Sequence, residues 1–364
     1  MTVNNHDRDD KLNVGHELDQ DQKLALETFV RLCKENDLLG RPDGMGGRDA
    51  LDAINDETAL IRFLRARKFD PEIAINQFYE ASLFRKENRV FEVYDGIRVQ
   101  DYETAGGAYP QWTGRLDKRG LPIFFVNTTN VKTSLLGYGN CNYGYVPRPS
   151  DSHSGPPPAD AAPQQERVDV LQLGSVMFDS YSRFVFPLCS MVTRRRVTSS
   201  VIVVDATTLS LKQGFDIRNF VKEASWLLTT CYPETVDKIF VCNCPSYFGT
   251  IWKLMKSWVD PITAAKLVFL SPAEVYPALK EHIHDDDLPT QVGGKLEFEH
   301  GRPADLSDAF KKALGREQLA AGPHKWVYDE KGGMSAVAVG SVDGKLRYEV
   351  VATLNGLGDS GLEG

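Results

Sequence analysis

Four basic residues lie within seven positions of one another: Arg62, Arg65, Arg67 and Lys68. A guanidinium group presents a planar fork of donors to phosphoryl oxygens, and a lysine adds a compact positive charge. The cluster is therefore able to bind a phosphate group. An isolated cluster of this kind is also typical of a solvated helix face, so the residues alone leave both interpretations open.

The segment from residue 239 to residue 270 places one lopsided helix between two apolar strands. Residues 239–242 and 266–270 have the short apolar runs of buried strands, and Pro245 ends the first of them. The helix between them carries Lys253 and Lys256 beside an apolar stripe, which consists of Phe248, Ile251, Trp252, Met255, Trp258 and Val259. Such a stripe commonly packs into a core. With two tryptophans and a basic edge, it also suits a helix that lines a cavity or lies on a membrane surface.

No motif of a known catalytic site is present. The sequence has no phosphate-binding loop, no Gly-x-Gly-x-x-Gly after a strand, no His-Glu-x-x-His and no Gly-x-Ser-x-Gly. Residues 358–361 imitate a serine-protease string without its structural context. His282, His284 and the aspartates that follow have no usual metal-ligand spacing, and we expect a solvated helix end there. We therefore expect no catalytic residues and no metal site.

The elements that must position these residues fall into two groups. Helices are predicted over residues 21–40 and 57–68, and from Pro71 onward, with Asp70 as the N-cap. After residue 121, strands at 122–126, 201–205, 238–242 and 266–270 alternate with helices, among them 216–231. This alternation predicts an α/β fold with a mostly parallel sheet. Beyond residue 300 we expect a helix near 306–314 and a hairpin that pairs 325–329 with 345–353.

The bulk composition is that of a globular protein. The chain has 364 residues, 42% of them hydrophobic, and a net charge of −8, which argues against a nucleic-acid binder. A local basic patch would still allow a membrane partner. No apolar run reaches the roughly 18 residues needed to span a bilayer, and the N-terminus lacks a signal-peptide pattern. The six cysteines are scattered, as expected for reduced core thiols in a cytoplasmic protein.

An ordered series of motifs carries a family resemblance. It runs through LIRFLRARKFDPE (60–72), DKRGLPIFFVN (117–127), VIVVDATTLSL (201–211), YPE (232–234), NCP (243–245), DPITAAK (260–266) and LPTQVGGKLEF (288–298). The chain resembles the CRAL-TRIO lipid-binding family, and specifically the fungal phosphatidylinositol/phosphatidylcholine transfer proteins, from about residue 20 to residue 300.

The resemblance implies a helical N-terminal module at 21–100, followed by a lipid-binding domain at 101–300. The sheet of that domain would floor a lipid cavity closed by a gating helix around 247–259. Residues 1–20 are expected to be a disordered acidic segment, and 137–166 a flexible insertion rich in Gly, Ser and Pro. Residues 301–364 would form an extension of unknown role.

The resemblance also implies ligand contacts. It places the contacts to the phosphatidylinositol headgroup at Arg67, Lys68, Glu234, Thr263 and Lys266, and all five residue types are present. The positions that serve choline in the family correspond here to Thr113, Phe124, Ser200 and Ile202, of which only the serine matches. A quaternary ammonium prefers several aromatic faces, and its phosphate prefers hydroxyl donors. We therefore expect phosphatidylcholine to be a poor ligand.

These observations predict a non-enzymatic, monomeric protein without a cofactor that binds phosphatidylinositol and transfers it at membrane surfaces. A lipid kinase is a candidate partner. Two alternatives remain open from the sequence. One is a carrier of another hydrophobic ligand, such as a sterol, an isoprenoid or haem. The other is a regulatory scaffold that senses lipid and contacts a lipid kinase or a trafficking protein.

Overall fold

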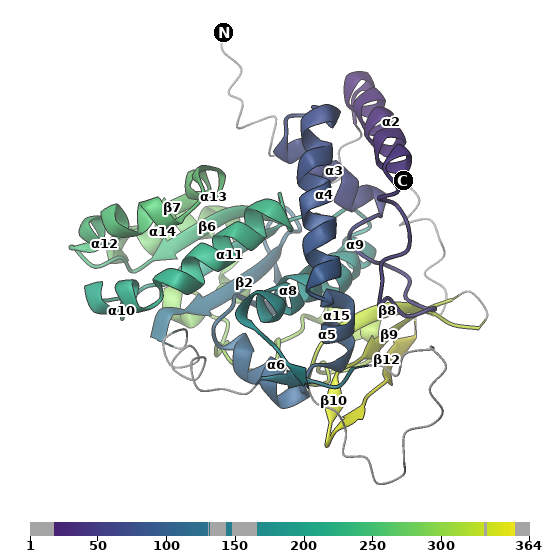
Figure 1. The fold of residues 1–364 in the computed structure, drawn as a ribbon. Helices are drawn as coiled ribbons and strands as arrows, with labels where there is room; N and C mark the ends of the chain where they lie inside the picture. The colour runs from purple at the N-terminus through teal and green to yellow at the C-terminus, as the bar shows by residue number, and fades with distance from the viewer. Residues whose placement is uncertain (1–17, 130, 132–142, 148–165, 331–332, 354–364) are drawn as a thin grey trace.

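The structure, a computed structural model, describes residues 18–129, 131, 143–147, 166–330 and 333–353. The N-terminal helices stand beside a central sheet, and a smaller sheet lies at the C-terminal end of the chain (Figure 1). The predicted disordered segment 1–20 and the predicted insertion 137–166 fall almost entirely outside the described residues.

The central sheet has five strands in the order β1-β2-β5-β6-β7. Their bounds are Gln111–Leu116 (β1), Pro122–Asn127 (β2), Ser200–Asp205 (β5), Val236–Cys242 (β6) and Leu267–Phe269 (β7). Strands β2, β5, β6 and β7 are parallel, and β1 pairs antiparallel with β2. The predicted parallel sheet is therefore confirmed, whereas the sequence did not indicate the edge strand β1.

Alternation along the strands gives this sheet two different faces. Ile202 and Val204 of β5 pair with Phe124 and Val126 of β2 and share one face with them. Helices α11 (Arg218–Thr230) and α12 (Phe248–Met255) lie over this face and enclose a cavity with it. On the other face, Phe240 meets His282 of α14 at a ring distance of 5.3 Å.

Three helices form the N-terminal part: α2 (Gln20–Glu35), α3 (Glu57–Ala66) and α4 (Pro71–Glu87). Helix α2 ends earlier than predicted because the side chain of Asn36 donates to the carbonyl of Leu32 at 2.9 Å and caps the last turn. Helix α3 also ends early, since Lys68 and Phe69 adopt left-handed backbone conformations. Asp70 caps α4 as predicted, accepting from the next two free backbone amides.

The remaining helices connect these parts. They are α5 (Val90–Gly96), α6 (Val99–Gly106), α8 (Val170–Ser180), the π-helix η1 (Tyr181–Val185), α9 (Phe186–Thr193), α10 (Leu211–Asp216), the 3₁₀-helix η2 (Lys256–Trp258), α13 (Pro261–Ala265), α14 (Pro272–His282), and the 3₁₀-helices η3 (Asp285–Asp287) and η4 (Thr290–Val292). The predicted helix at 216–231 is confirmed as α11. The predicted helix around 247–259 is divided between α12 and η2.

The C-terminal part contains α15 (Asp308–Leu314) and a sheet in the order β12-β9-β8. These strands are His324–Tyr328 (β8), Met334–Ala338 (β9) and Glu349–Thr353 (β12), and two short pairs accompany them: β10 (Ser341–Val342) with β11 (Lys345–Leu346), and β3 (Gly144–Tyr145) with β4 (Glu166–Arg167). The predicted pairing of 325–329 with 345–353 is wrong, because β9 lies between them. Strand β9 is short and contains two alanines, which are depleted in strands, so its pattern did not stand out.

The C-terminal sheet packs against the rest of the protein. Trp326 is fully buried and stacks on Phe184 of η1 at a centroid distance of 5.6 Å. The ammonium group of Lys325 forms buried ion pairs with Asp49 and Asp95, each at 2.7 Å. Since removing one partner of such a pair leaves an uncompensated buried charge, this segment contributes to the stability of the whole chain.

Candidate functional site

An apolar cavity of about 240 Å³ lies between the central sheet and helices α11 and α12. The sheet lines it with side chains from β2, β5, β6 and β7, and α11 contributes Phe220 and Val221. Among the described residues, the hydroxyl-bearing side chains that line it are Tyr109, Thr128, Ser225 and Thr263. The cavity therefore suits hydrocarbon, whose burial is worth roughly 0.8 kcal/mol per methylene group.

The residues predicted for the gating helix separate into two groups. Phe248, Trp252, Met255 and Val259 line the cavity, and Trp252 packs against Phe269 of β7 at 4.8 Å. Ile251 is fully buried and points instead toward α10, close to Gly214. Trp258 is half-buried in η2 and does not line the cavity. Helix α12 therefore forms a wall of the cavity.

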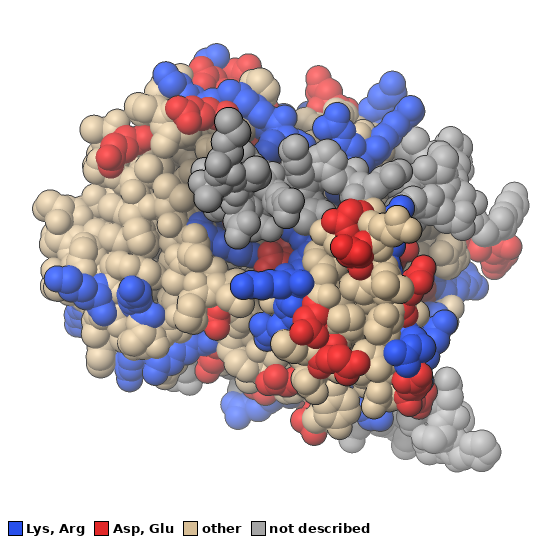
Figure 2. All heavy atoms as spheres, turned by 90° about the horizontal axis from the view of Figure 1, so that it is seen from above, with Lys and Arg blue, Asp and Glu red and all other residues tan. Residues whose placement is uncertain are grey.

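An exposed apolar surface lies outside this wall. It consists of Leu211, Phe215, Tyr247, Leu254 and Ile262, which are between 40% and 50% exposed. They come from α10, α12, α13 and the residue before α12, and Lys212, Lys253 and Lys256 are exposed beside them. In Figure 2 this end of the molecule lies on the left, where much of the surface is uncharged and basic side chains stand at its edge.

The four positions matched to choline recognition offer no free hydroxyl group. The hydroxyl of Thr113 donates to the carbonyl of Ile123, and that of Ser200 donates to the carbonyl of Thr235, both at 3.0 Å. Both side chains are buried. Phe124 is fully buried, and Ile202 lines the apolar cavity. The structure thus makes this region apolar, and its polar groups are already satisfied.

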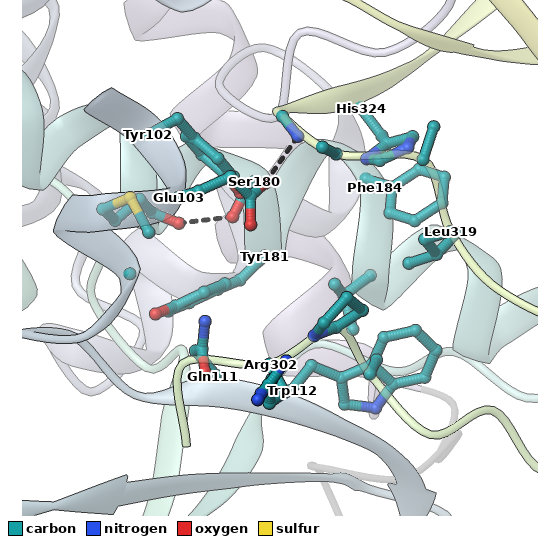
Figure 3. Close-up of a pocket in the computed structure, with 18 of the residues that line it drawn as sticks. Tyr102, Glu103, Gln111, Trp112, Ser180, Tyr181, Phe184, Arg302, Leu319 and His324 are labelled. Carbon is teal, nitrogen blue, oxygen red and sulfur yellow. Dashed lines mark hydrogen bonds between the residues drawn. The ribbon is translucent and has the colours of Figure 1, made fainter. Parts of the chain in front are cut away.

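A smaller cavity of about 120 Å³ lies beneath the C-terminal segment (Figure 3). Tyr181 reaches it from η1, and the same ring packs against Phe124 at 4.3 Å. Leu319 and His324 of the C-terminal segment form the opposite wall, and Glu103 of α6 accepts a hydrogen bond from the amide of Gly322 at 2.6 Å. The extension beyond residue 300 therefore helps to enclose the interior next to the four choline-matched positions, Thr113, Phe124, Ser200 and Ile202, which we call the second-ligand region.

Three of the five residues predicted for the headgroup lie together. The Lys266 ammonium pairs with the Glu234 carboxylate at 3.1 Å and donates to the carbonyl of Val236 at 2.7 Å. Glu234, Thr263 and Lys266 all line one small cavity of about 20 Å³, which has room for about one water molecule. Thr263 and Leu228 also line the large apolar cavity, so the polar cluster borders the hydrocarbon-lined space.

Arg67 and Lys68 do not line this small cavity, although Ala66, directly before them, does. Lys68 is exposed, Arg67 is half-buried, and neither side chain has an ion-pair partner among the residues that the structure describes. Lys68, Phe69 and Glu234 all have positive φ, at 54°, 60° and 56°. Left-handed conformations of non-glycine residues cost of order 1–3 kcal/mol and cluster at functional sites.

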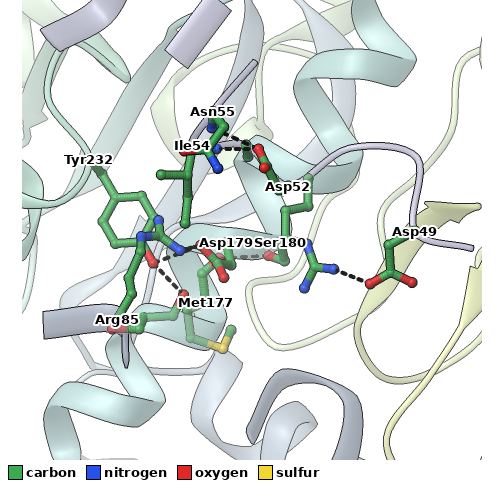
Figure 4. A network of polar contacts seen from close by, with 12 residues as sticks. Asp49, Asp52, Ile54, Asn55, Arg85, Met177, Asp179, Ser180 and Tyr232 are labelled. Atoms are coloured by element: carbon green, nitrogen blue, oxygen red, sulfur yellow. Dashed lines mark hydrogen bonds and ion pairs between the residues drawn. The ribbon is translucent and has the colours of Figure 1, made fainter. Parts of the chain in front are cut away.

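A buried network holds the segment that carries Glu234. Arg85 pairs with Asp179 at 2.8 Å, and the hydroxyl of Tyr232 donates to the same Asp179 oxygen at 2.8 Å (Figure 4). Burial opposes the charge of Arg85, but Asp179 and Tyr232 together raise its pKa above the usual value. Sequence reasoning missed Arg85 and Asp179, because a single charged residue in a helix gives no signal of its partner.

The metal-like residues, the cysteines and the string at 358–361 are the remaining sequence features. Among the described residues, no group of His, Cys, Asp and Glu has the arrangement of a metal site. Cys242 and Cys244 are buried and free, and burial raises the pKa of both thiols. The string at 358–361 lies outside the described residues.

Within the described chain, every helix is too short or too polar to cross a bilayer.

The chain is similar in sequence to a known protein family and to several known proteins. The family described as "CRAL/TRIO domain" matches residues 108–294. The chain is 27% identical over 244 residues to "SEC14 cytosolic factor" of Candida glabrata, covering 67% of this chain and 72% of that protein. It is also 27% identical over 247 residues to "Phosphatidylinositol/phosphatidylcholine transfer protein SFH12" of Arabidopsis thaliana, covering 66% of this chain and 40% of that protein. A crystal structure titled "Crystal structure of Sfh5" aligns with a TM-score of 0.48 at 13% identity, covering 82% of this chain and 98% of that one.

Proposed function

This chain belongs to the CRAL/TRIO domain family, and on that premise we propose that it binds phosphatidylinositol and transfers it between membranes. The proposal rests on the position of Thr263, which lines both the apolar cavity and the small cavity that holds the charged pair. On one side lies a cavity lined by hydrocarbon side chains, and on the other lies the pair formed by Lys266 and Glu234. A phospholipid needs the same junction between its acyl chains and its headgroup.

The headgroup would be bound by exchange of partners. Lys266 would turn from Glu234 to the phosphodiester, with Arg67 and Lys68 supplying further positive charge from the end of α3. The carboxylate of Glu234 would then accept hydrogen bonds from inositol hydroxyl groups, and the hydroxyl of Thr263 would donate to the phosphate. The exchange requires no bond making or breaking, so the proposed activity needs no catalytic residue.

Lipid exchange requires helix α12 to move. The apolar cavity of about 240 Å³ is smaller than the roughly 300–1,000 Å³ of a typical pocket for a drug-sized ligand, and a diacyl lipid is larger than such a ligand. Because α12 carries cavity-lining residues on one face and Leu254 of the exposed apolar surface on the other, its displacement at a membrane would open the cavity toward the lipid. The protein would thus act as a peripheral carrier on the cytoplasmic side of a membrane.

The second-ligand region favours a lipid without choline. Thr113 and Ser200 direct their hydroxyl groups to backbone carbonyls, and Ile202 presents hydrocarbon to the cavity. At these four matched positions a quaternary ammonium group would find neither several aromatic faces nor free hydroxyl donors. We therefore propose that phosphatidylcholine is not the main second ligand, and that a more apolar molecule such as a sterol or an isoprenoid takes its place.

Transfer of labelled lipids between donor and acceptor vesicles tests this function. The proposal expects phosphatidylinositol to move at a rate well above that of phosphatidylcholine. Transfer of a sterol alone would favour a carrier of another hydrophobic ligand. Binding of phosphatidylinositol without any transfer would favour the lipid-sensing scaffold, for which a lipid kinase is the candidate partner.

A further inference from the structure

A polar cavity of about 420 Å³ lies at the N-terminal end of helix α3, away from the proposed lipid site. It is enclosed by the first turn of α3, the π-helix η1, the start of α9 and the segment at residues 196–197. Two buried polar atoms of residues that line it have no hydrogen-bond partner in the described part of the chain: Nε of Arg62 and Oγ of Ser182. Unsatisfied buried groups are rare in folded proteins and require an explanation.

Arg62 is the stronger of these two signals. Arg62 is only 4% exposed, and its one hydrogen bond within the described chain is a long bond of 3.4 Å to the carbonyl of Ala53. Asp56 attracts it electrostatically, but no carboxylate among the described residues lies within ion-pair distance. Burial lowers the pKa of Arg62 to about 10. A buried guanidinium group with an unused donor is suited to an anion.

Ser182 supplies a second group. It lies in η1, whose widened turns are frequently found at functional sites, and it is only 5% exposed. The neighbouring Ser190 also lines the cavity, but its hydroxyl already donates to the carbonyl of Phe186 and accepts from the amide of Val197. The free hydroxyl of Ser182 is therefore a donor that this part of the fold leaves unused.

The mouth of the cavity combines a second cation with acceptors. Arg196, the last residue of the Arg194–Arg196 run, pairs with Glu57 at 2.9 Å, and both side chains line the cavity. Asp56 adds a second carboxylate, and Thr58 adds a hydroxyl group. Two guanidinium groups would suit a phosphate, and two carboxylates would suit hydroxyl groups on the same ligand.

We propose that this cavity binds a small phosphate ester that carries hydroxyl groups, such as a sugar phosphate or a polyol phosphate. Arg62 and Ser182 turn their unpartnered atoms, which are buried in this structure, toward the cavity and bind the phosphate there, and Asp56 and Glu57 accept hydrogen bonds from the ligand hydroxyls nearer the mouth. The site is separate from the proposed headgroup site. Arg67 and Lys68 lie at the opposite end of α3, which at 10 residues is about 15 Å long.

The test measures binding of three probes to the full-length protein by calorimetry: glucose 6-phosphate, glucose and inorganic phosphate. We expect glucose 6-phosphate to bind most tightly. The Ser182→Ala variant should weaken it about tenfold, because one hydrogen bond to a charged group is lost. The fold should be unaffected, since this oxygen has no partner in the protein. Ser82→Ala is the matched control, because its hydroxyl is likewise buried and unpartnered but lies outside this cavity.

A second variant, Arg196→Gln, should also weaken glucose 6-phosphate about tenfold, and the ion pair with Glu57 that it breaks is partly exposed. Unchanged affinity in both variants would overturn the proposal. Loss of binding in Lys266→Ala but not in Ser182→Ala would overturn it as well, because the probe would then occupy the headgroup site. Equal affinity for glucose, or for inorganic phosphate, would show that a phosphorylated polyol is not the preferred ligand.

Discussion

The double variant Lys68→Gly with Lys266→Ala should abolish phosphatidylinositol transfer while the protein remains folded. Both lysines would donate to the lipid phosphate, and a hydrogen bond to a charged group contributes about 1.5–3 kcal/mol. At 1.4 kcal/mol for each tenfold change, one lysine is worth about 10- to 150-fold in affinity, and two independent lysines about 10²- to 10⁴-fold. A loss of this size would bring transfer to background.

The two substitutions are chosen for their effects on the fold. Lys68 is exposed and has a φ of 54°, so glycine removes the charge and keeps a backbone conformation that glycine adopts readily. Lys266 and Glu234 are 20% and 19% exposed, so breaking their pair lowers the free energy of unfolding by about 1–3 kcal/mol. A reduction of this size leaves most domains folded at 25 °C.

The assay is transfer of labelled phosphatidylinositol between vesicles, with thermal unfolding followed by circular dichroism. Lys295→Ala with Lys311→Ala is the control, because it removes one exposed and one half-buried lysine, each of which pairs with an exposed acid. This control lowers the net charge by the same two units as the Lys68/Lys266 variant, and it should transfer lipid at the wild-type rate. Transfer by the folded Lys68/Lys266 variant at close to the wild-type rate would refute the headgroup site.

Three further perturbations probe the cavity, the buried network and the pH dependence. Ala224→Trp places an indole ring in the apolar cavity, so lipid transfer should fall at least tenfold with an unchanged melting temperature; normal transfer would show that lipid does not enter there. Asp179→Asn leaves Arg85 buried without its counter-ion and should lower the free energy of unfolding by about 3–5 kcal/mol in urea, whereas Arg85→Met with Asp179→Leu should lose less. Burial lowers the pKa of His324 to about 3 from its usual 6.5. Below pH 6.5 the unfolded chain therefore binds a proton that the folded protein does not, so the free energy of unfolding falls as the pH decreases from 6.5. At pH 5 this loss is about 2 kcal/mol, and His324→Phe should remove it from the pH profile; an identical profile in that variant would contradict the assignment.

The sequence predicted the parts of the fold that have strong local patterns. The four parallel strands stood out because they are short apolar runs that alternate with helices, and α4 because Asp70 and Pro71 mark its start. The same reasoning missed β1 and β9, whose patterns are weaker. Strand β9 also lies between β8 and β12, the two segments that the sequence pattern had paired directly. The error therefore came from a strand that was not predicted, rather than from a wrong assignment of β8 or β12.

The candidate site was accessible to sequence reasoning only through matched motifs. Glu234 and Lys266 lie just before β6 and β7, and Thr263 lies in α13, so their grouping depends on how these elements pack in the fold. No local sequence pattern reveals that packing. Arg85 and Asp179 are 94 positions apart in the sequence, and their pairing depends on the packing of α4 against α8. The proposed phosphate site at α3 rests on two atoms without a partner in the described chain, Nε of Arg62 and Oγ of Ser182, and this is a property of the folded structure alone.

The most direct test of the central claim is mass spectrometry of the lipids that co-purify with the protein from a eukaryotic host. We expect phosphatidylinositol as a major bound lipid, with little phosphatidylcholine. Either phosphatidylcholine, or a sterol or haem without phosphatidylinositol, as the dominant ligand would contradict it.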